Sequence, residues 1–224
     1  DLTDYFVIFK VGSSNINGFF TNINYLGSAL DGQIVTNTDD AVIISNMIPA
    51  NYVWDGGAAD NNWSSATNWV GDKTPVNDGR AKLIFATNNI RTTPFVDTNW
   101  FVRSIIFTNN INSYTLSGSN ITIKGQVGTG IVQGAINWQR INNGITVFTN
   151  QSWFAELGDL ILGGTVDVGQ QTLALAGANE FVFTNGSSLV LSNGTLHNRS
   201  GGLYLTGSGD GSGVLRNRGG SSLV

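Results

Sequence analysis

The chain has 224 residues, of which 41% are hydrophobic, so its composition excludes a disordered segment and suits one large β domain or two smaller ones. Only 12% of the residues are charged, the net charge is −4 and no basic stripe is present, so we expect no nucleic-acid partner. No apolar run approaches the ~20 residues of a membrane-spanning helix, and no segment has the apolar spacing of an amphipathic helix.

Residues 1–50 are expected to form a β segment that resembles the end of a preceding module. The runs 5–9 and 41–44 are rich in β-branched and aromatic residues, and Pro49 then interrupts strand pairing because it lacks an N–H. An open strand edge invites another strand, so these runs are candidates for pairing with a neighbouring module or subunit. The candidate assembly residues, which include one in the last residues of the chain, are Phe6, Ile8, Val42, Ile44 and Leu223.

Residues 51–103 differ because they hold four of the six tryptophans among Asn, Asp and Gly. Two interpretations of Trp54, Trp63 and Trp69 stay open. Exposed, they would form a carbohydrate-binding platform, since an indole face stacks on a pyranose ring and amides bind its hydroxyls. Buried, they would plug the open end of a β core. The segment is therefore predicted to be a Trp/Asn-rich cap or entry segment.

Residues 104–224 repeat one unit, a short run of alternating apolar residues followed by a Gly/Asn turn. This alternation predicts half-buried strands, and the turn residues tolerate positive φ or hydrogen-bond to their own backbone. From Leu160 onward the predicted strands begin at positions 160, 173, 189 and 203, a loose period that favours a coil of stacked strands. The predicted strands are 105–107, 114–116, 121–123, 145–147, 160–162, 173–175, 189–191 and 203–205.

The motifs of residues 52–224 resemble those of a known family. They are Trp54-Asp55-Gly56-Gly57, Asn62-Trp63-Ser64, Asn68-Trp69, Val102-Arg103-Ser104-Ile105-Ile106-Phe107 and Leu160-Ile161-Leu162-Gly163-Gly164. This pattern resembles the autotransporter-associated β-strand repeat proteins, large bacterial surface or secreted β-helix proteins. The resemblance implies a right-handed β-solenoid, export, and adhesion or scaffolding, and it implies no catalytic residue. The absence of cysteine fits such exported proteins.

Candidate chemical groups are sparse. The only histidine, His197, has no nearby Asp and no nucleophile turn, so we expect an exposed loop side chain. Glu156 and Glu180 would have to face each other to act as a glycosidase pair, and we expect solvent-facing turn ends instead. The oxygen-rich segments 55–62 and 207–211 are candidates for Ca²⁺, against a simpler interpretation as Asx turns. We therefore expect no metal, no other cofactor and no enzymatic activity.

The sequence as a whole predicts an all-β protein, a right-handed β-solenoid with a Trp-rich N-terminal cap or insert and a preceding β segment. The predicted function is that of a structural or adhesive segment of an extracellular or cell-surface bacterial protein, self-assembling end to end into a filament. A carbohydrate-binding module that uses the Trp cluster is the alternative. The expected partners are further copies, neighbouring modules of a longer chain, or surface glycans. Residues 221–224 end within a coil, so we expect the last edge to be covered by more chain or by another subunit.

Overall fold

The structure is a computed structural model of the chain. It describes residues 6–10, 34–37, 41–45, 51–86, 91–108, 112–125, 129–184, 186–205, 214–218 and 222–223, with side chains only between residues 51 and 203. The chain forms two compact units, residues 1–50 and residues 51–224. In the described ranges, the one helix is a single 3₁₀ turn, η1 (Ala66–Asn68), so the predicted all-β class is confirmed.

The first unit is a three-stranded antiparallel sheet. It contains β1 (Phe6–Lys10), β2 (Ile34–Asn37) and β3 (Ala41–Ser45), in the spatial order β1-β3-β2. A β-bulge between Val7 and Phe9 interrupts the register of β1 with β3. The central strand is therefore β3, which has backbone partners on both sides.

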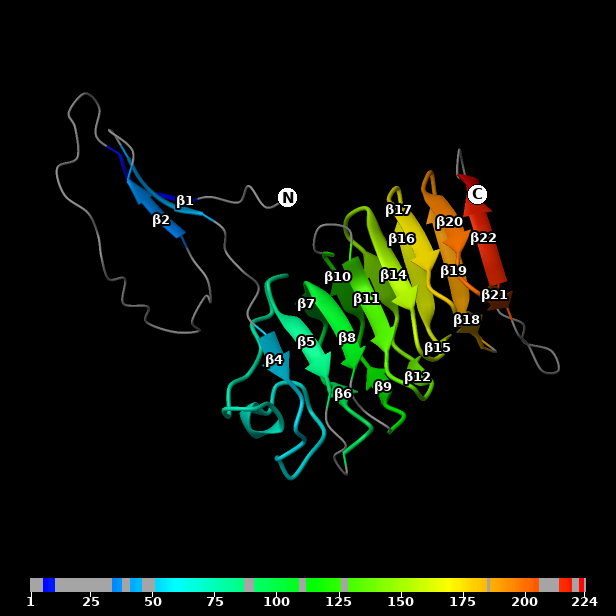
Figure 1. The fold of residues 1–224 in the computed structure, drawn as a ribbon, viewed down its shortest axis with the longest axis horizontal. Helices are drawn as coiled ribbons and strands as arrows, with labels where there is room; N and C mark the ends of the chain where they lie inside the picture. The colour runs from blue at the N-terminus through cyan, green and yellow to red at the C-terminus, as the bar shows by residue number, and fades with distance from the viewer. Residues whose placement is uncertain are drawn as a thin grey trace. The chain divides into compact units, whose positions relative to one another are not determined.

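The second unit is a β-solenoid of about five turns, built from three parallel sheets (Figure 1). Sheet I contains β4 (Asn51–Val53), β5 (Lys82–Phe85), β8 (Ser104–Thr108), β11 (Thr129–Gly134), β14 (Gln151–Ala155), β17 (Thr172–Ala176), β20 (Thr195–Arg199) and β23 (Ser222–Leu223). Sheet II contains β6 (Phe95–Val96), β9 (Thr115–Gly118), β12 (Gln139–Ile141), β15 (Leu160–Leu162), β18 (Glu180–Phe183) and β21 (Gly202–Leu205). Sheet III contains β7 (Trp100–Val102), β10 (Ile121–Ile123), β13 (Ile145–Val147), β16 (Thr165–Gly169), β19 (Ser188–Ser192) and β22 (Val214–Arg218).

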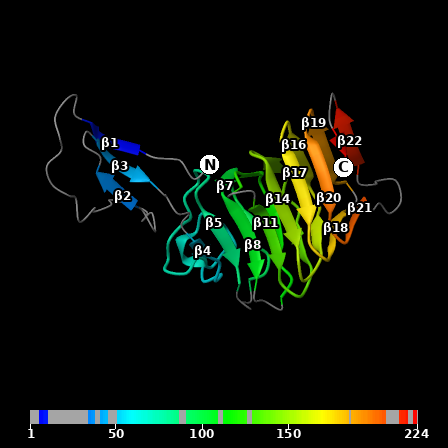
Figure 2. The ribbon, with the colours of Figure 1, turned by 45° about the horizontal axis from the view of Figure 1, so that its top comes forward.

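Each coil of the solenoid uses one strand from each sheet in turn, I, then II, then III. Stacked pairs such as Ile141 and Leu162, or Ile105 and Ile131, mark the length of one coil. Only the step from β4 to β5 is longer, because the Trp-rich segment is inserted there. Figure 2 shows the strands of sheet I side by side along the solenoid. The coil length falls in the range typical of solenoids, in which each unit is stabilised by its neighbours.

The solenoid core is filled by every second residue of the strands. One column of sheet I stacks Leu83, Ile105, Ile131, Trp153 and Leu175, all fully buried. Because side chains alternate between the two faces of a strand, the in-out-in pattern of the sequence puts these residues on the inner face. The core therefore follows from the alternation that predicted the strands.

Buried glutamines fill three corner positions of this core. Gln133 donates to Ala135 O and Asn137 O, at 3.0 and 2.8 Å. Gln151 donates to Ile123 O and Thr149 O, at 3.0 and 3.1 Å, and its Oε1 accepts from Trp153 Nε1 at 2.9 Å. Gln139 acts in the same way at its own corner. These amides hydrogen-bond to carbonyl groups at strand ends and in turns, so the polar side chains are satisfied inside the core.

The eight strands predicted for residues 104–224 are all present, but the predicted spacing was wrong. From Leu160 onward, every second strand of the structure was not predicted, namely β16, β18 and β20. The solenoid also begins before residue 104, since β4 to β7 belong to the same sheets as the later strands. The predicted entry segment is therefore part of the solenoid and contributes its first coils.

Candidate functional site

The Trp-rich segment between β4 and β5 folds over the N-terminal end of the solenoid. Trp54 forms an antiparallel bridge with Trp69, and Asn62 forms a parallel bridge with Phe95 of sheet II. The backbone N–H of Val70 donates to Val53 O at 2.9 Å, so part of the outer edge of β4 already has a partner. This segment extends sheet II by one short bridge and covers part of the first strand of sheet I.

Beneath this segment lies a cluster of aromatic rings, here called the aromatic plug: Trp54, Trp63, Trp69, Phe85 and Trp100. Trp54 packs edge-to-face on Trp69, with ring centroids 5.2 Å apart, and Trp63 packs in the same way on Trp100 at 5.7 Å. Such edge-to-face contacts add to the stabilisation that burial provides.

The plug corrects the carbohydrate interpretation of the tryptophans. Trp54, Trp63 and Trp69 are fully buried, so none offers an indole face to a sugar. Two of their N–H groups are also occupied, because Trp54 Nε1 donates to Arg91 O at 3.0 Å and Trp69 Nε1 donates to Trp63 O at 2.8 Å. The physical reason is the inserted loop, which places large rings where the inner faces of the first strands would otherwise meet water.

A network of hydrogen bonds around Asn68 holds the loop in place. The Asn68 side chain is fully buried and donates to Asn62 O at 2.9 Å and to Asp60 Oδ1 at 3.2 Å, while its own Oδ1 accepts from Ala58 N. Asp60 also accepts from Asn62 N and from Ser65 Oγ. These hydrogen bonds, the one from the Asn62 backbone foremost, lower the pKa of Asp60 below its ordinary value.

The oxygen atoms of segment 55–62 that were proposed as Ca²⁺ ligands therefore accept hydrogen bonds within the loop itself. Asp55 Oδ1 accepts from Gly57 N at 3.1 Å, in the manner of an Asx turn, and Asp60 is bonded as described. Within the described ranges, no group of three or more His, Asp or Glu side chains is placed to hold a metal ion. Segment 207–211 lies outside the described residues.

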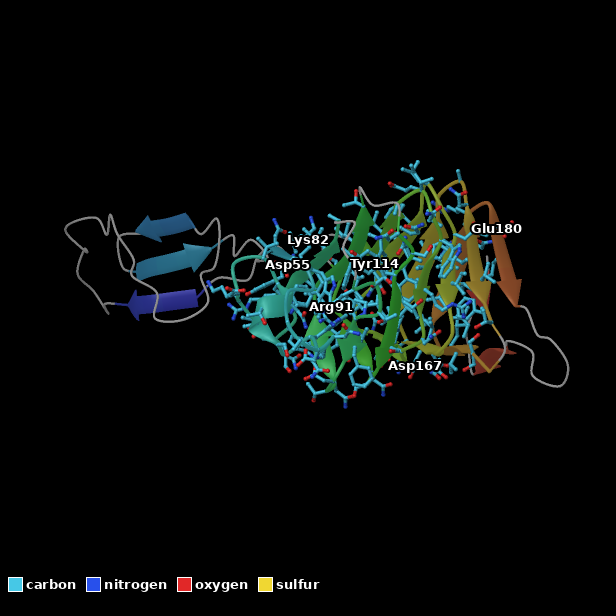
Figure 3. The ribbon with its side chains drawn as sticks, turned by 90° about the horizontal axis from the view of Figure 1, so that it is seen from below. Asp55, Lys82, Arg91, Tyr114, Asp167 and Glu180 are labelled. Atoms are coloured by element: carbon cyan, nitrogen blue, oxygen red, sulfur yellow. The ribbon has the colours of Figure 1, made fainter. Side chains whose placement is uncertain are left out.

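The other predicted chemical groups are spread over different coils. His197 lies on β20 beside Ala174 of β17 and is partly exposed. Glu156 Oε2 points toward Gly134 of the preceding coil, whereas Glu180 begins β18 in the following coil. In Figure 3, Asp55 and Arg91 lie near the N-terminal end of the solenoid and Glu180 lies near the other end. The Glu156 carboxylate is thus directed to the coil before its own, and Glu180 belongs to the coil after it.

The candidate assembly residues of the first unit divide into two groups. Val42 and Ile44 belong to β3, which already pairs with β1 and β2, so the structure corrects their assignment: a central strand has no free edge. Phe6 and Ile8 belong to β1, which is an edge strand of this sheet. The remaining candidate, Leu223, lies in β23, the last strand of sheet I, and pairs with Leu196.

Sequence reasoning missed an exposed apolar group on the corners between sheets I and II. Trp138 is 44% exposed, and Ile136 and Leu157 are 69% and 60% exposed. The alternation of the strand carried a signal for Trp138, because it directly precedes Gln139, and an inward Gln139 implies an outward Trp138.

Comparison with protein-family models, with curated proteins and with solved structures finds no match to this chain. Within the ranges described, no helix has the length and hydropathy needed to span a membrane. The fold and the arrangement of the residues are therefore the basis of the functional proposal.

Proposed function

We propose that this chain is a non-enzymatic structural segment of an extracellular bacterial surface or secreted protein, whose solenoid is extended end to end by further strands at its C-terminal end. One observation carries the proposal: the two ends of the solenoid differ. At the N-terminal end, the aromatic plug and the Trp-rich loop cover the first coil. At the other end, β21, β22 and β23 are the last strands of their sheets.

The stacking of the coils supports extension. The described strand pairs of the solenoid are parallel, and pairs such as Ile105 with Ile131 and Leu173 with Leu196 keep buried residues over buried residues, so each coil is a template for the next one. The last strand of a sheet presents unpaired N–H and C=O groups that another strand satisfies. In this proposal the added strands belong to another copy of the chain.

The extracellular placement rests on composition and on the resemblance of the sequence motifs. The chain combines no cysteine with 29 Gly and few charges, a composition that suits long β-solenoids exported in an unfolded state. Adhesion is the corresponding role for a long, weakly charged outer surface.

Electron microscopy and sedimentation of the whole chain over a range of concentrations test the proposal. We expect particles that lengthen along the solenoid axis as the concentration rises. Leu223→Lys places a charge in the last strand of sheet I and is expected to prevent this lengthening, because edge lysines block strand addition. Thr146→Lys is the matched control, since Thr146 is exposed on β13, a strand that has a neighbouring strand on each side within sheet III.

Two results would contradict the proposal. One is a particle length that stays constant at all concentrations. The other is lengthening that Thr146→Lys and Leu223→Lys change to the same extent, because that result would place the contact on the side of the solenoid.

A further inference from the structure

Trp138 stands at the start of sheet II, on the outer side of the solenoid. It directly precedes β12, Asp159 directly precedes β15, and Glu180 is the first residue of β18. The residues that follow them, Gln139, Leu160 and Phe181, are aligned in register and buried. By strand alternation, the three preceding side chains therefore lie in one column on the outer face.

The column combines an aromatic ring with hydrogen-bonding groups. The guanidinium carbon of Arg140 lies 5.9 Å from the centroid of the Trp138 ring and helps to fix the ring. On the next coils, Asp159 Oδ1 accepts from Glu180 N at 3.1 Å, so the Asp159 carboxylate is also held. Both acidic side chains are partly exposed and still accessible to a ligand.

We propose that this column, with Trp138 as its main contact, binds an extended neutral polysaccharide of β-1,4-linked pyranose units. A pyranose has an apolar face that stacks on an indole and hydroxyls that both donate and accept hydrogen bonds. Those hydroxyls match the acceptors Asp159 and Glu180 and the donor Arg140 together. An anionic chain would instead face two carboxylates.

The geometry favours a straight chain along the solenoid axis. Neighbouring strands lie about 4.8 Å apart, close to the length of one pyranose unit in an extended β-1,4-linked chain. From Trp138 to Glu180 the column spans two such steps, or about 10 Å. Successive sugar units therefore meet successive side chains of the column.

The size of the apolar area favours a polysaccharide over a protein partner. The exposed large apolar side chains at this corner are Ile136, Trp138 and Leu157, which offer at most a few hundred Å². A stable protein interface buries roughly 800 Å² on each partner. The inference goes beyond the end-to-end extension proposed above and does not depend on it.

Calorimetric titration of the whole chain with cellohexaose and with chitohexaose tests the site, at a protein concentration at which the chain is monomeric. We expect at least one of the two to bind with a Kd below ~1 mM and to change the tryptophan fluorescence. Trp138→Ala is expected to weaken binding about tenfold or more, whereas Trp138→Phe keeps a stacking ring and most of the affinity. Asp159→Asn is expected to weaken binding several-fold.

Phe148→Ala is the matched control, because Phe148 is an exposed aromatic residue, 53% accessible, that follows β13 in sheet III. It is expected to bind like the unchanged chain, as is Leu223→Lys, so the failure of the extension proposal would leave this result intact. The inference is overturned if neither oligosaccharide binds, or if Trp138→Ala binds as tightly as the unchanged chain. It is also overturned if Trp138→Ala abolishes self-association in sedimentation but leaves oligosaccharide binding unchanged.

Discussion

Trp63 shows how single residues of the plug stabilise the solenoid. Its ring is fully buried between Trp69, Phe85 and Trp100, and the segment that carries it covers the first coil. Removing such a ring loses both the burial of a large apolar surface and the contacts of its neighbours. The plug is therefore a structural element, and its tryptophans are expected to matter for stability.

We predict that Trp63→Ala lowers the free energy of unfolding by about 3–5 kcal/mol, a typical cost for a large aromatic residue in a core. Urea unfolding followed by circular dichroism measures the change. Trp138→Ala serves as the control, because this residue is 44% exposed and its loss should cost under ~1 kcal/mol. An equal decrease in the free energy of unfolding for the two variants would refute the structural role of the plug.

Gln151 illustrates the buried amides at the corners. Its side chain is nearly fully buried, donates to Ile123 O and to Thr149 O, and accepts from the indole N–H of Trp153. A leucine of similar size would remove all three hydrogen bonds. Ile123 O would keep its bond from Phe148 N, but Thr149 O and the Trp153 N–H would lose the bonds that Gln151 makes to them, and each such loss costs about 1–3 kcal/mol.

We therefore predict that Gln151→Leu destabilises the solenoid by about 2–5 kcal/mol in urea unfolding, although it makes the core more apolar. Gln170→Leu is the matched control, since Gln170 is exposed in the turn after β16 and its change should stay within about 0.5 kcal/mol. A neutral or stabilising Gln151→Leu would show that the corner amides are dispensable.

At the scale of the elements, the turns between strands set how closely the coils stack. Gly177 follows β17 with a φ of +113°, and a Cβ at this position would lie 2.2 Å from Ala155 O of the preceding coil. Only glycine combines this backbone conformation with such a close approach. The Gly-rich turns are thus required by coil stacking as well as by chain reversal.

Gly177→Ala is expected to cost more than ~2 kcal/mol, because it adds a steric clash to the strain of a positive φ. In Gly186→Ala the φ is +81° but no atom lies within 4 Å of the added Cβ, so only the backbone strain of about 1–2 kcal/mol is expected. The difference between the two unfolding midpoints measures the clash. If both variants unfold at the same urea concentration, the coils are not as closely stacked as described.

The same scale explains what the sequence allowed us to predict. Alternation located Leu160–Leu162 and seven further strands, because period two is visible in a single short run, but it passed over the apolar strand Glu180–Phe183. It missed Thr165–Gly169 and Thr195–Arg199, which carry polar residues on their outer faces, and Thr195–Arg199 buries Leu196 as its one apolar residue. How many strands make up one coil depends on which residues stack on one another in neighbouring coils, as Trp153 and Leu175 do. Because some strands were not predicted, the predicted period was wrong as well.

The site residues show the same limit. Composition identified the Trp cluster, but it left open whether Trp54, Trp63 and Trp69 are exposed, since burial depends on the inserted loop and on Phe85 and Trp100 from other coils. Trp138 stood outside that cluster and drew no attention, although its place before Gln139 implies exposure. The order of strands in the first unit, which makes β3 central, is likewise a tertiary property.

At the scale of the whole solenoid, the two ends have different chemistry. The N-terminal end has a filled aromatic plug and a β4 edge that is partly bonded by Val70. The C-terminal end has the last strands of all three sheets, including β23 paired on one side with β20. The account therefore predicts growth at one end only.

Hydrogen exchange of the whole chain, measured by mass spectrometry at low and at high protein concentration, tests whether the solenoid grows from its C-terminal end. Exchange reports which backbone N–H groups gain a partner when particles associate. Extension from the C-terminal end predicts slower exchange in β21, β22 and β23, the last strands of the three sheets, at high concentration, and unchanged exchange in β4. Slower exchange in β4, or no change at either end while particles lengthen, would contradict extension from the C-terminal end.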